Sequence, residues 1–128
     1  MHAVLAICLG ACIGALARWQ LGLWLNHAGA WLPCGTLAAN LAGGYLVGLC
    51  VAVFEQHPGL DPAWRLLLVT GFLGALTTFS SFSAEVVEML MRQRYLPAAG
   101  TVLLHLGGSL LLTVAGIRTA SFLIAVRA

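Results

Sequence analysis

Charged residues are scarce in this sequence. Only 8% of its 128 residues are Asp, Glu, Lys or Arg, lysine is absent, and all six basic residues are arginine. A formal net charge of +2 without a basic cluster offers no electrostatic surface for nucleic acid, so we expect no nucleic-acid partner. A soluble globular domain is also disfavoured, because such domains average about 25% charged residues.

The cysteines form no recognisable framework. Cys8, Cys12 and Cys50 lie inside apolar runs, and Cys34 follows Pro33 at the edge of one. This spacing fits neither a disulfide scaffold nor a zinc site, which needs about four convergent ligands. We therefore interpret the cysteines as small hydrophobic side chains.

Apolar residues dominate instead, at 61% of the chain, with a mean hydropathy of +0.98. A helix needs about 20 apolar residues to cross ~30 Å of hydrocarbon, and the sequence has four suitable runs, at residues 3–25, 35–54, 63–93 and 97–126. We predict an all-α membrane protein that forms a single four-helix domain over residues 1–128, with its function inside the lipid bilayer. A cleaved signal peptide ending near Ala17 is disfavoured, because no basic region precedes an apolar run that is too long.

A polar segment interrupts the third apolar run. It extends from Gly71 to Ser83 and holds five hydroxyl residues beside Phe79 and Phe82. Because glycine weakens helices and Ser or Thr side chains divert backbone hydrogen bonds, we predict a break between Gly74 and Ser80. Backbone groups freed at this depth must be buried in protein or line a wet cavity, which indicates an ion or solute site. A small-residue packing seam is the alternative.

The other three spans carry small or polar residues four positions apart, so that each set lies on one helix face. The sets are Gly10, Gly14, Arg18 and Gly22; Thr36, Asn40, Gly44 and Gly48; and Thr101, His105, Ser109 and Thr113. Gly10 and Gly14 predict a close helix contact, while Arg18 either reaches the membrane interface or faces a solute. The set in the fourth span predicts a polar ridge that lines a path.

These polar residues are neutral hydrogen-bond donors, and no carboxylate lies at mid-span. Hydroxyls and amides donate to anions, and the edge of a phenyl ring is its positive part, so an anion or neutral solute is favoured. We expect Phe79 and Phe82 to present their edges to one anion beside Ser80 and Ser83; ordinary core aromatics are the alternative.

The remaining charges are expected near the ends of the spans. Glu85 and Glu88 are interpreted as interfacial charges near a mouth, within reach of Arg92. The arginines divide evenly, with Arg65, Arg118 and Arg127 towards one side and Arg18, Arg92 and Arg94 towards the other. Since the Lys/Arg excess sets orientation, this balance predicts insertion in both orientations and an antiparallel homodimer.

The run Thr77-Thr-Phe-Ser-Ser-Phe-Ser83, with Gly35-Thr-Leu, Asn40 and Gly14-Ala-x-x-Arg18-Trp19, resembles the CrcB or Fluc family of bacterial fluoride channels. The resemblance covers nearly the whole chain. It implies four-helix subunits in an antiparallel, dual-topology homodimer of the bacterial inner membrane, which exports fluoride passively and is not an enzyme. It also implies a structural sodium ion, held at the dimer centre by the main-chain carbonyls of Gly74 and Thr77.

The resemblance implies pore residues as well, which are Asn40, Phe79, Ser80, Phe82, Ser83 and Ser109. Arg18, Thr36, His105 and Thr113 are further candidates for the pore or its vestibule. The chain departs from the family pattern at Ala75 and Ser81, which are both conservative changes, and Thr101 receives no pore role. A small multidrug-type exporter, which would depend on Glu85, and a non-transporting assembly subunit remain alternatives.

Overall fold

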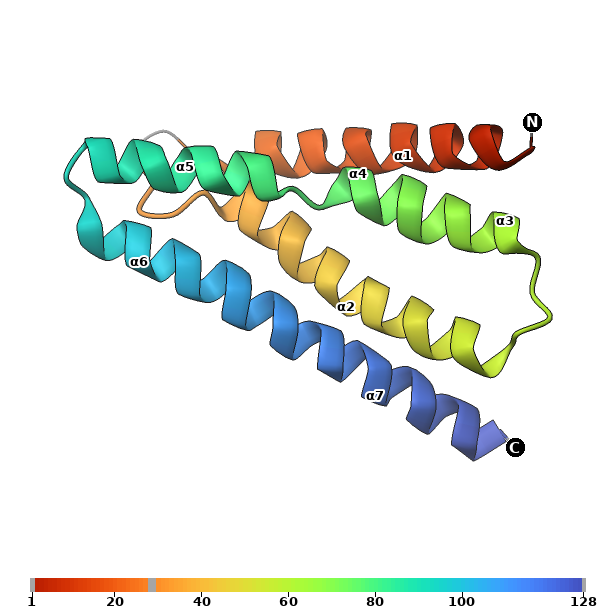
Figure 1. Ribbon diagram of the computed structural model, residues 1–128. Coiled ribbons are helices and arrows are strands. Elements are labelled where there is room, and N and C mark those ends of the chain that lie inside the picture. The colour runs from red at the N-terminus through yellow and green to blue at the C-terminus, as the bar shows by residue number, and fades with distance from the viewer. Residues whose placement is uncertain (1, 28–29, 128) are drawn as a thin grey trace.

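The computed structural model describes residues 2–27 and 30–127, and within those ranges the chain is helical without strands (Figure 1). Ala28 and Gly29, in the predicted first turn, lie outside the described residues. The first span is α1 (His2–Leu25), and the second is α2 (Cys34–Gln56). The third span comprises α3 (Pro62–Arg65), η1 (Leu66–Leu73), α4 (Gly74–Leu76) and α5 (Phe79–Met91). The fourth comprises α6 (Tyr95–Leu103), η2 (Leu104–Gly108) and α7 (Ser109–Arg127).

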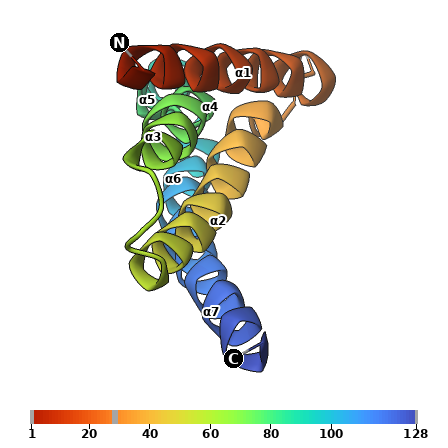
Figure 2. The same cartoon turned by 90° about the vertical axis from the view of Figure 1, so that its right-hand side faces the viewer.

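All four spans are long and apolar enough to cross a membrane, as predicted. They alternate in direction, so that the two ends of the chain lie at the same end of the molecule (Figure 1). Figure 2 shows α1 lying across one side of the third span, while α2 and α7 extend away from it. Large apolar side chains such as Leu103, Leu111 and Phe122 are exposed, as is expected where lipid or a second protein surface covers them.

Glycines bring the helices into backbone contact. A Cβ placed on Gly10 or Gly14 would lie 2.1 Å from the carbonyl oxygen of Leu67 or Phe72, respectively. The predicted contact face of the first span is therefore confirmed, and its partner is the third span. A Cβ on Gly48 would likewise lie 2.2 Å from the Thr113 carbonyl oxygen, so α2 and α7 pack equally closely.

The third span begins and ends with recognisable caps. Asp61 precedes Pro62 and accepts a 2.8 Å hydrogen bond from the Ala63 amide, an N-cap arrangement typical of an Asp-Pro pair. At the far end, Gln93 has φ of 57°, and the amides of Gln93 and Arg94 bond to the carbonyls of Leu90 and Met89. This is a Schellman motif with glutamine at the left-handed position.

The predicted break is present. Thr77 and Thr78 have extended backbone angles, with ψ of 154° and 116°, between the end of α4 and the start of α5. The two π-helical segments were not predicted. η1 leads up to the break, and η2 carries His105 in the fourth span. Such segments often occur at functional sites, and their wider turns leave little trace in residue periodicity.

Candidate functional site

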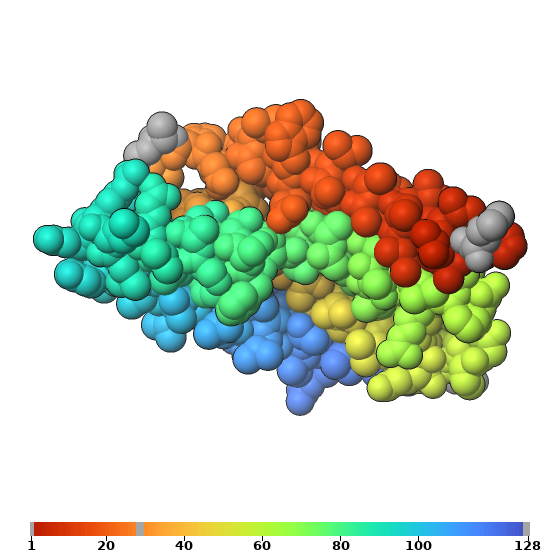
Figure 3. Space-filling model, turned by 45° about the horizontal axis from the view of Figure 1, so that its top comes forward, coloured from red at the N-terminus to blue at the C-terminus, as the bar shows by residue number. Residues whose placement is uncertain are grey.

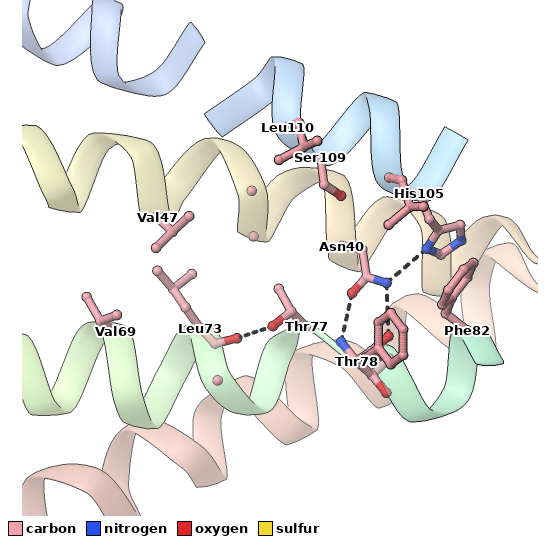
Figure 4. A pocket seen from close by; sticks show the side chains of 15 residues that line it. Asn40, Val47, Val69, Leu73, Thr77, Thr78, Phe82, His105, Ser109 and Leu110 are labelled. Carbon is pink, nitrogen blue, oxygen red and sulfur yellow. Dashed lines mark hydrogen bonds between the residues drawn. The ribbon is translucent and has the colours of Figure 1, made fainter. Parts of the chain in front are cut away.

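Asn40 of α2 replaces the helical hydrogen bonds that the break removes. Its Oδ1 accepts a 2.7 Å bond from the Thr78 amide, and its Nδ2 donates a 3.0 Å bond to the Thr78 carbonyl (Figure 4). Both backbone groups of Thr78 are therefore satisfied by one side-chain amide. Thr78 is buried, so these bonds avoid the free-energy cost of burying its N–H and its carbonyl without hydrogen-bond partners.

The same contacts release two main-chain carbonyls. In an unbroken helix the amides of Thr78 and Ser81 would bond to the carbonyls of Gly74 and Thr77. Here the Thr78 amide bonds to Asn40, and the Ser81 amide bonds to Thr78 Oγ1 at 3.1 Å. The carbonyls of Gly74 and Thr77 thus lose their helical partners, which is the consequence expected of a break at this position.

An aromatic stack adjoins Asn40. The His105 ring lies 4.7 Å from the Phe82 ring at 30°, and Phe82 lies 5.4 Å from Phe79 at 58°. Nδ1 of His105 is 2.9 Å from Nδ2 of Asn40. His105 and Phe82 are buried at 4% and 7% exposure, whereas Phe79 is 73% exposed. The predicted pair therefore has one buried ring and one that projects from the surface of the chain.

These residues line an open-sided cavity of about 450 Å³ between the second, third and fourth spans (Figure 4). Four predicted pore residues contribute to its wall, and they are Asn40, Phe79, Phe82 and Ser109. His105, Gly74 and Thr77 line it too. The rest of the wall is mostly apolar, with side chains such as Val47, Leu73 and Leu110. A few neutral donors in such surroundings suit a small ligand that exchanges water for protein hydrogen bonds.

Ser80 and Ser83 lie beside this cavity and are already hydrogen bonded. The Ser80 hydroxyl is 3.2 Å from Thr78 Oγ1, and the Ser83 hydroxyl donates a 2.8 Å bond to the Phe79 carbonyl. Neither residue is part of the cavity wall. The hydroxyl residues of the predicted polar segment are thus divided between the cavity wall, which includes Thr77 and Thr78, and local hydrogen bonds.

The four members of the ridge predicted in the fourth span lie in different surroundings. Its middle members, His105 and Ser109, line the cavity, but its ends serve helix packing. Thr101 is 1% exposed and donates to the Pro97 carbonyl at 2.9 Å, while the one hydroxyl hydrogen of Thr113 is shared between the carbonyls of Gly44, at 3.0 Å, and Ser109, at 2.9 Å. Threonine hydroxyls bond readily to the carbonyl four residues earlier, so a four-residue spacing is equally compatible with packing.

A second cavity, of about 300 Å³, lies at the mouth between the first turn and α5. Figure 3 shows the surface hollowed between the start of the second span and α5. Glu85 and Glu88 line it, which agrees with the expected position near a mouth. Glu88 forms an exposed 2.6 Å ion pair with Arg92, also as expected. Glu85 differs from the prediction, because it is half-buried and accepts a 2.5 Å hydrogen bond from Thr36.

Arg18 is the one candidate that lies apart from these groups. It is half-buried on α1 and is not among the residues that line either cavity. Thr78 was missed as a site residue, although a hydroxyl residue directly before an apolar helical run is a recognised N-cap signal. The Asn40 contacts with Thr78 and His105 join residues 38 and 65 positions apart, which no sequence spacing reveals.

Comparison with known proteins identifies the family. The model of the CrcB-like protein, Camphor Resistance (CrcB), family matches residues 5–117. This chain belongs to the CrcB family. A relative from Albidiferax ferrireducens named fluoride-specific ion channel FluC is 73% identical over 125 residues, covering 98% of this chain and 95% of the relative.

Two further relatives bear the same name. The protein from Paracidovorax citrulli is 63% identical, over 91% of this chain and 92% of its own length. The protein from Chromobacterium violaceum is 55% identical, over 94% of this chain and 95% of its own length. The resemblance stated from the sequence motifs is thereby confirmed, and this CrcB-family chain spans nearly the full length of these relatives.

Proposed function

We propose that this chain is a fluoride-selective channel that lets fluoride leave the cytoplasm passively. The observation that carries the proposal is its 73% identity, over nearly both full lengths, to a relative named as a fluoride-specific channel. The site at the break supports it, because neutral donors and ring edges suit a small anion.

The physical task is compatible with this site. Hydrogen fluoride is a weak acid that crosses membranes as a neutral molecule and dissociates in a near-neutral cytoplasm, which traps the anion. A passive path then lets fluoride leave down its gradient and protects the cell. Fluoride holds its water tightly, so selective passage needs replacement donors along a narrow route. Ser109 and the edges of Phe79 and Phe82 supply such groups, while Asn40 lines the cavity with its N–H groups bound to Thr78 and His105.

The functional unit is an antiparallel homodimer in the bacterial inner membrane. The cavity is open on one side, and Phe79 projects from it at 73% exposure. A Cβ placed on Gly74 would find the Val69 carbonyl oxygen only at 3.6 Å, so the backbone at the break is open to close approach. A second copy that crosses at the break would cover these surfaces and complete the path.

A sodium ion fits at the centre of this dimer. The carbonyls of Gly74 and Thr77 have lost their helical partners, and two copies would bring four such oxygens together. Hard cations prefer oxygen ligands, and neutral carbonyls without a carboxylate favour a monovalent ion. When bound, it would supply a fixed positive charge that links the two breaks. Density at the dimer axis, surrounded by main-chain oxygens of both subunits, is the expected result; an unbroken third helix would contradict it.

Flux from liposomes tests the proposed function. Liposomes that hold only the purified chain are loaded with potassium fluoride, and external fluoride is followed with an electrode. A channel should release fluoride only after valinomycin lets potassium follow, because anion movement alone builds up a voltage. Release without valinomycin, driven by a proton gradient and abolished by Glu85→Gln, would instead indicate the coupled exporter. If fluoride is released neither after valinomycin nor under a proton gradient, the non-transporting assembly subunit is favoured.

A further inference from the structure

The hydrogen bonds around Asn40 determine the orientation of its side-chain amide. The Thr78 N–H needs an acceptor, so the Asn40 atom 2.7 Å from it must be the oxygen Oδ1. Nδ2 then faces the Thr78 carbonyl oxygen at 3.0 Å and donates one of its two hydrogens there. The second hydrogen of Nδ2 is directed at Nδ1 of His105, 2.9 Å away.

This orientation fixes the protonation pattern of His105. An amide N–H can bond to Nδ1 only if that nitrogen carries no proton and accepts. The neutral ring must then carry its proton on Nε2. Nε2 is buried and has no hydrogen-bond partner among the described residues, so the ring's contact with Asn40 alone selects the tautomer.

We propose that His105 is a positioning residue of the channel, which acts through its unprotonated Nδ1 to hold Asn40 on Thr78 at the break. The inference rests on the proposed function for its meaning in conduction. The hydrogen bond itself is independent of that function, because it concerns only which nitrogen of His105 bears the proton and that the other nitrogen holds Asn40.

Two features make His105 suited to this role. Its ring is 4% exposed and stacks on Phe82, which fixes the ring plane and therefore the direction of Nδ1. It also lies on η2, in the segment where the fourth span departs from regular α-helical hydrogen bonding. Without the Nδ1 acceptor, one N–H of Asn40 would be left buried without a partner, or the amide would rotate and release Thr78.

Three variants of His105 distinguish an acceptor at the position of Nδ1 from polar atoms at the position of Nε2. In His105→Asn the side-chain oxygen is as many bonds from Cβ as Nδ1 is, so the acceptor for Asn40 is kept. In His105→Gln the terminal atoms match Nε2 instead, and His105→Phe keeps the stack on Phe82 without any nitrogen. All three proteins are checked for helix content and monodispersity before their fluoride flux is measured in liposomes.

We expect His105→Asn to keep at least about a third of the wild-type flux, whereas His105→Gln and His105→Phe lose at least about tenfold, because a buried donor loses its partner. Wild-type flux in the Phe or Gln variant would overturn the proposal. Flux in the Asn variant as low as in the Phe variant would also overturn it, because the acceptor position would not be what matters.

A spectroscopic measurement tests the tautomer directly. In protein labelled with ¹⁵N-histidine, comparison with His105→Phe identifies the His105 signals. We expect a bare Nδ1 and a protonated Nε2, and a mixture of both neutral tautomers after Asn40→Leu removes the donor. A proton on Nδ1 in the wild type would overturn the proposal. If the expected pattern is found in a chain that shows no fluoride flux, the proposed function fails while the contact between His105 and Asn40 stands.

Discussion

Asn40 and Thr78 exchange two hydrogen bonds, of 2.7 and 3.0 Å, in which a side-chain amide replaces the backbone partners that the broken helix lacks. This pairing lets an extended residue persist inside a membrane span. It also occupies the Thr78 amide, which in an unbroken helix would bond to the Gly74 carbonyl. The break and the free Gly74 carbonyl are therefore linked to one side chain of the neighbouring span.

Replacing Asn40 by alanine should destabilise the protein and stop conduction. Two buried backbone groups of Thr78 would lose their partners, at about 1–3 kcal/mol each, so we expect a clear fall in melting temperature and at least about a tenfold loss of fluoride flux. Thr119→Ala is the matched control, since Thr119 bonds only to the Ala115 carbonyl within α7. Unchanged flux in Asn40→Ala would show that the pairing is dispensable.

Gly43 should be required for the position of the break. A Cβ on Gly43 would lie 2.1 Å from the Thr77 γ-methyl carbon, so Gly43→Ala must displace Thr77 and we expect at least about a tenfold loss of flux. Thr77→Ser removes that methyl group but keeps the hydroxyl that bonds to Leu73, and the double variant should recover most of the flux.

Gly107 provides the control for this experiment. A Cβ there would meet no atom within 4 Å, so Gly107→Ala should conduct like the wild type. If Gly43→Ala is inactive but Thr77→Ser does not restore it, contact with the γ-methyl group is not the cause of the defect.

Phe79→Ile and Phe82→Ile should both reduce fluoride flux, because each removes a ring edge from the cavity. Their stability should differ. Phe82 is buried against His105, so its replacement should lower the melting temperature, whereas the 73% exposed Phe79 should tolerate isoleucine within the isolated subunit. Phe122→Ile, on the exposed side of α7, is the control. Wild-type flux in both Phe79→Ile and Phe82→Ile would remove the rings from the mechanism.

Subunits should insert in both orientations. α3, which ends at Arg65, and the end of α7 at Arg127 lie at one end of the molecule, and the α5–α6 connection with Arg92 and Arg94 lies at the other, so neither side has a clear excess of positive charge. Reporter fusions at the carboxyl terminus should report cytoplasmic and periplasmic populations together. Two arginines added at one end should leave a single orientation, and a single orientation of the unmodified chain would rule out the antiparallel dimer.

Much of this fold was predictable from the sequence, because helix starts and breaks depend on local chemistry. The apolar run from residue 63 predicted the third span, and Gly74 with the following hydroxyl residues predicted its interruption. Gly10 and Gly14 predicted a contact face, although not its partner. Motif resemblance supplied the family, and the neutral donors indicated the type of ligand.

The arrangement of the site was less predictable, because it depends on contacts between spans. Thr113 and Ser109 share a helix face at the predicted spacing, yet Thr113 bonds across to Gly44 while Ser109 lines the cavity. Glu85 was expected to behave like Glu88, but the approach of Thr36 on α2 distinguishes them. The π-helical segment that carries His105 likewise has no signal in the sequence.

The most direct measurement of the central claim is the ratio of fluoride to chloride flux through the purified chain under identical gradients. A route that replaces the water of a small anion with Ser109 and ring edges, beside the break that Asn40 holds, should pass fluoride and exclude the larger chloride, so we predict rapid fluoride release and chloride release no faster than from empty liposomes. Comparable rates for both ions, or no fluoride release at all, would contradict the account.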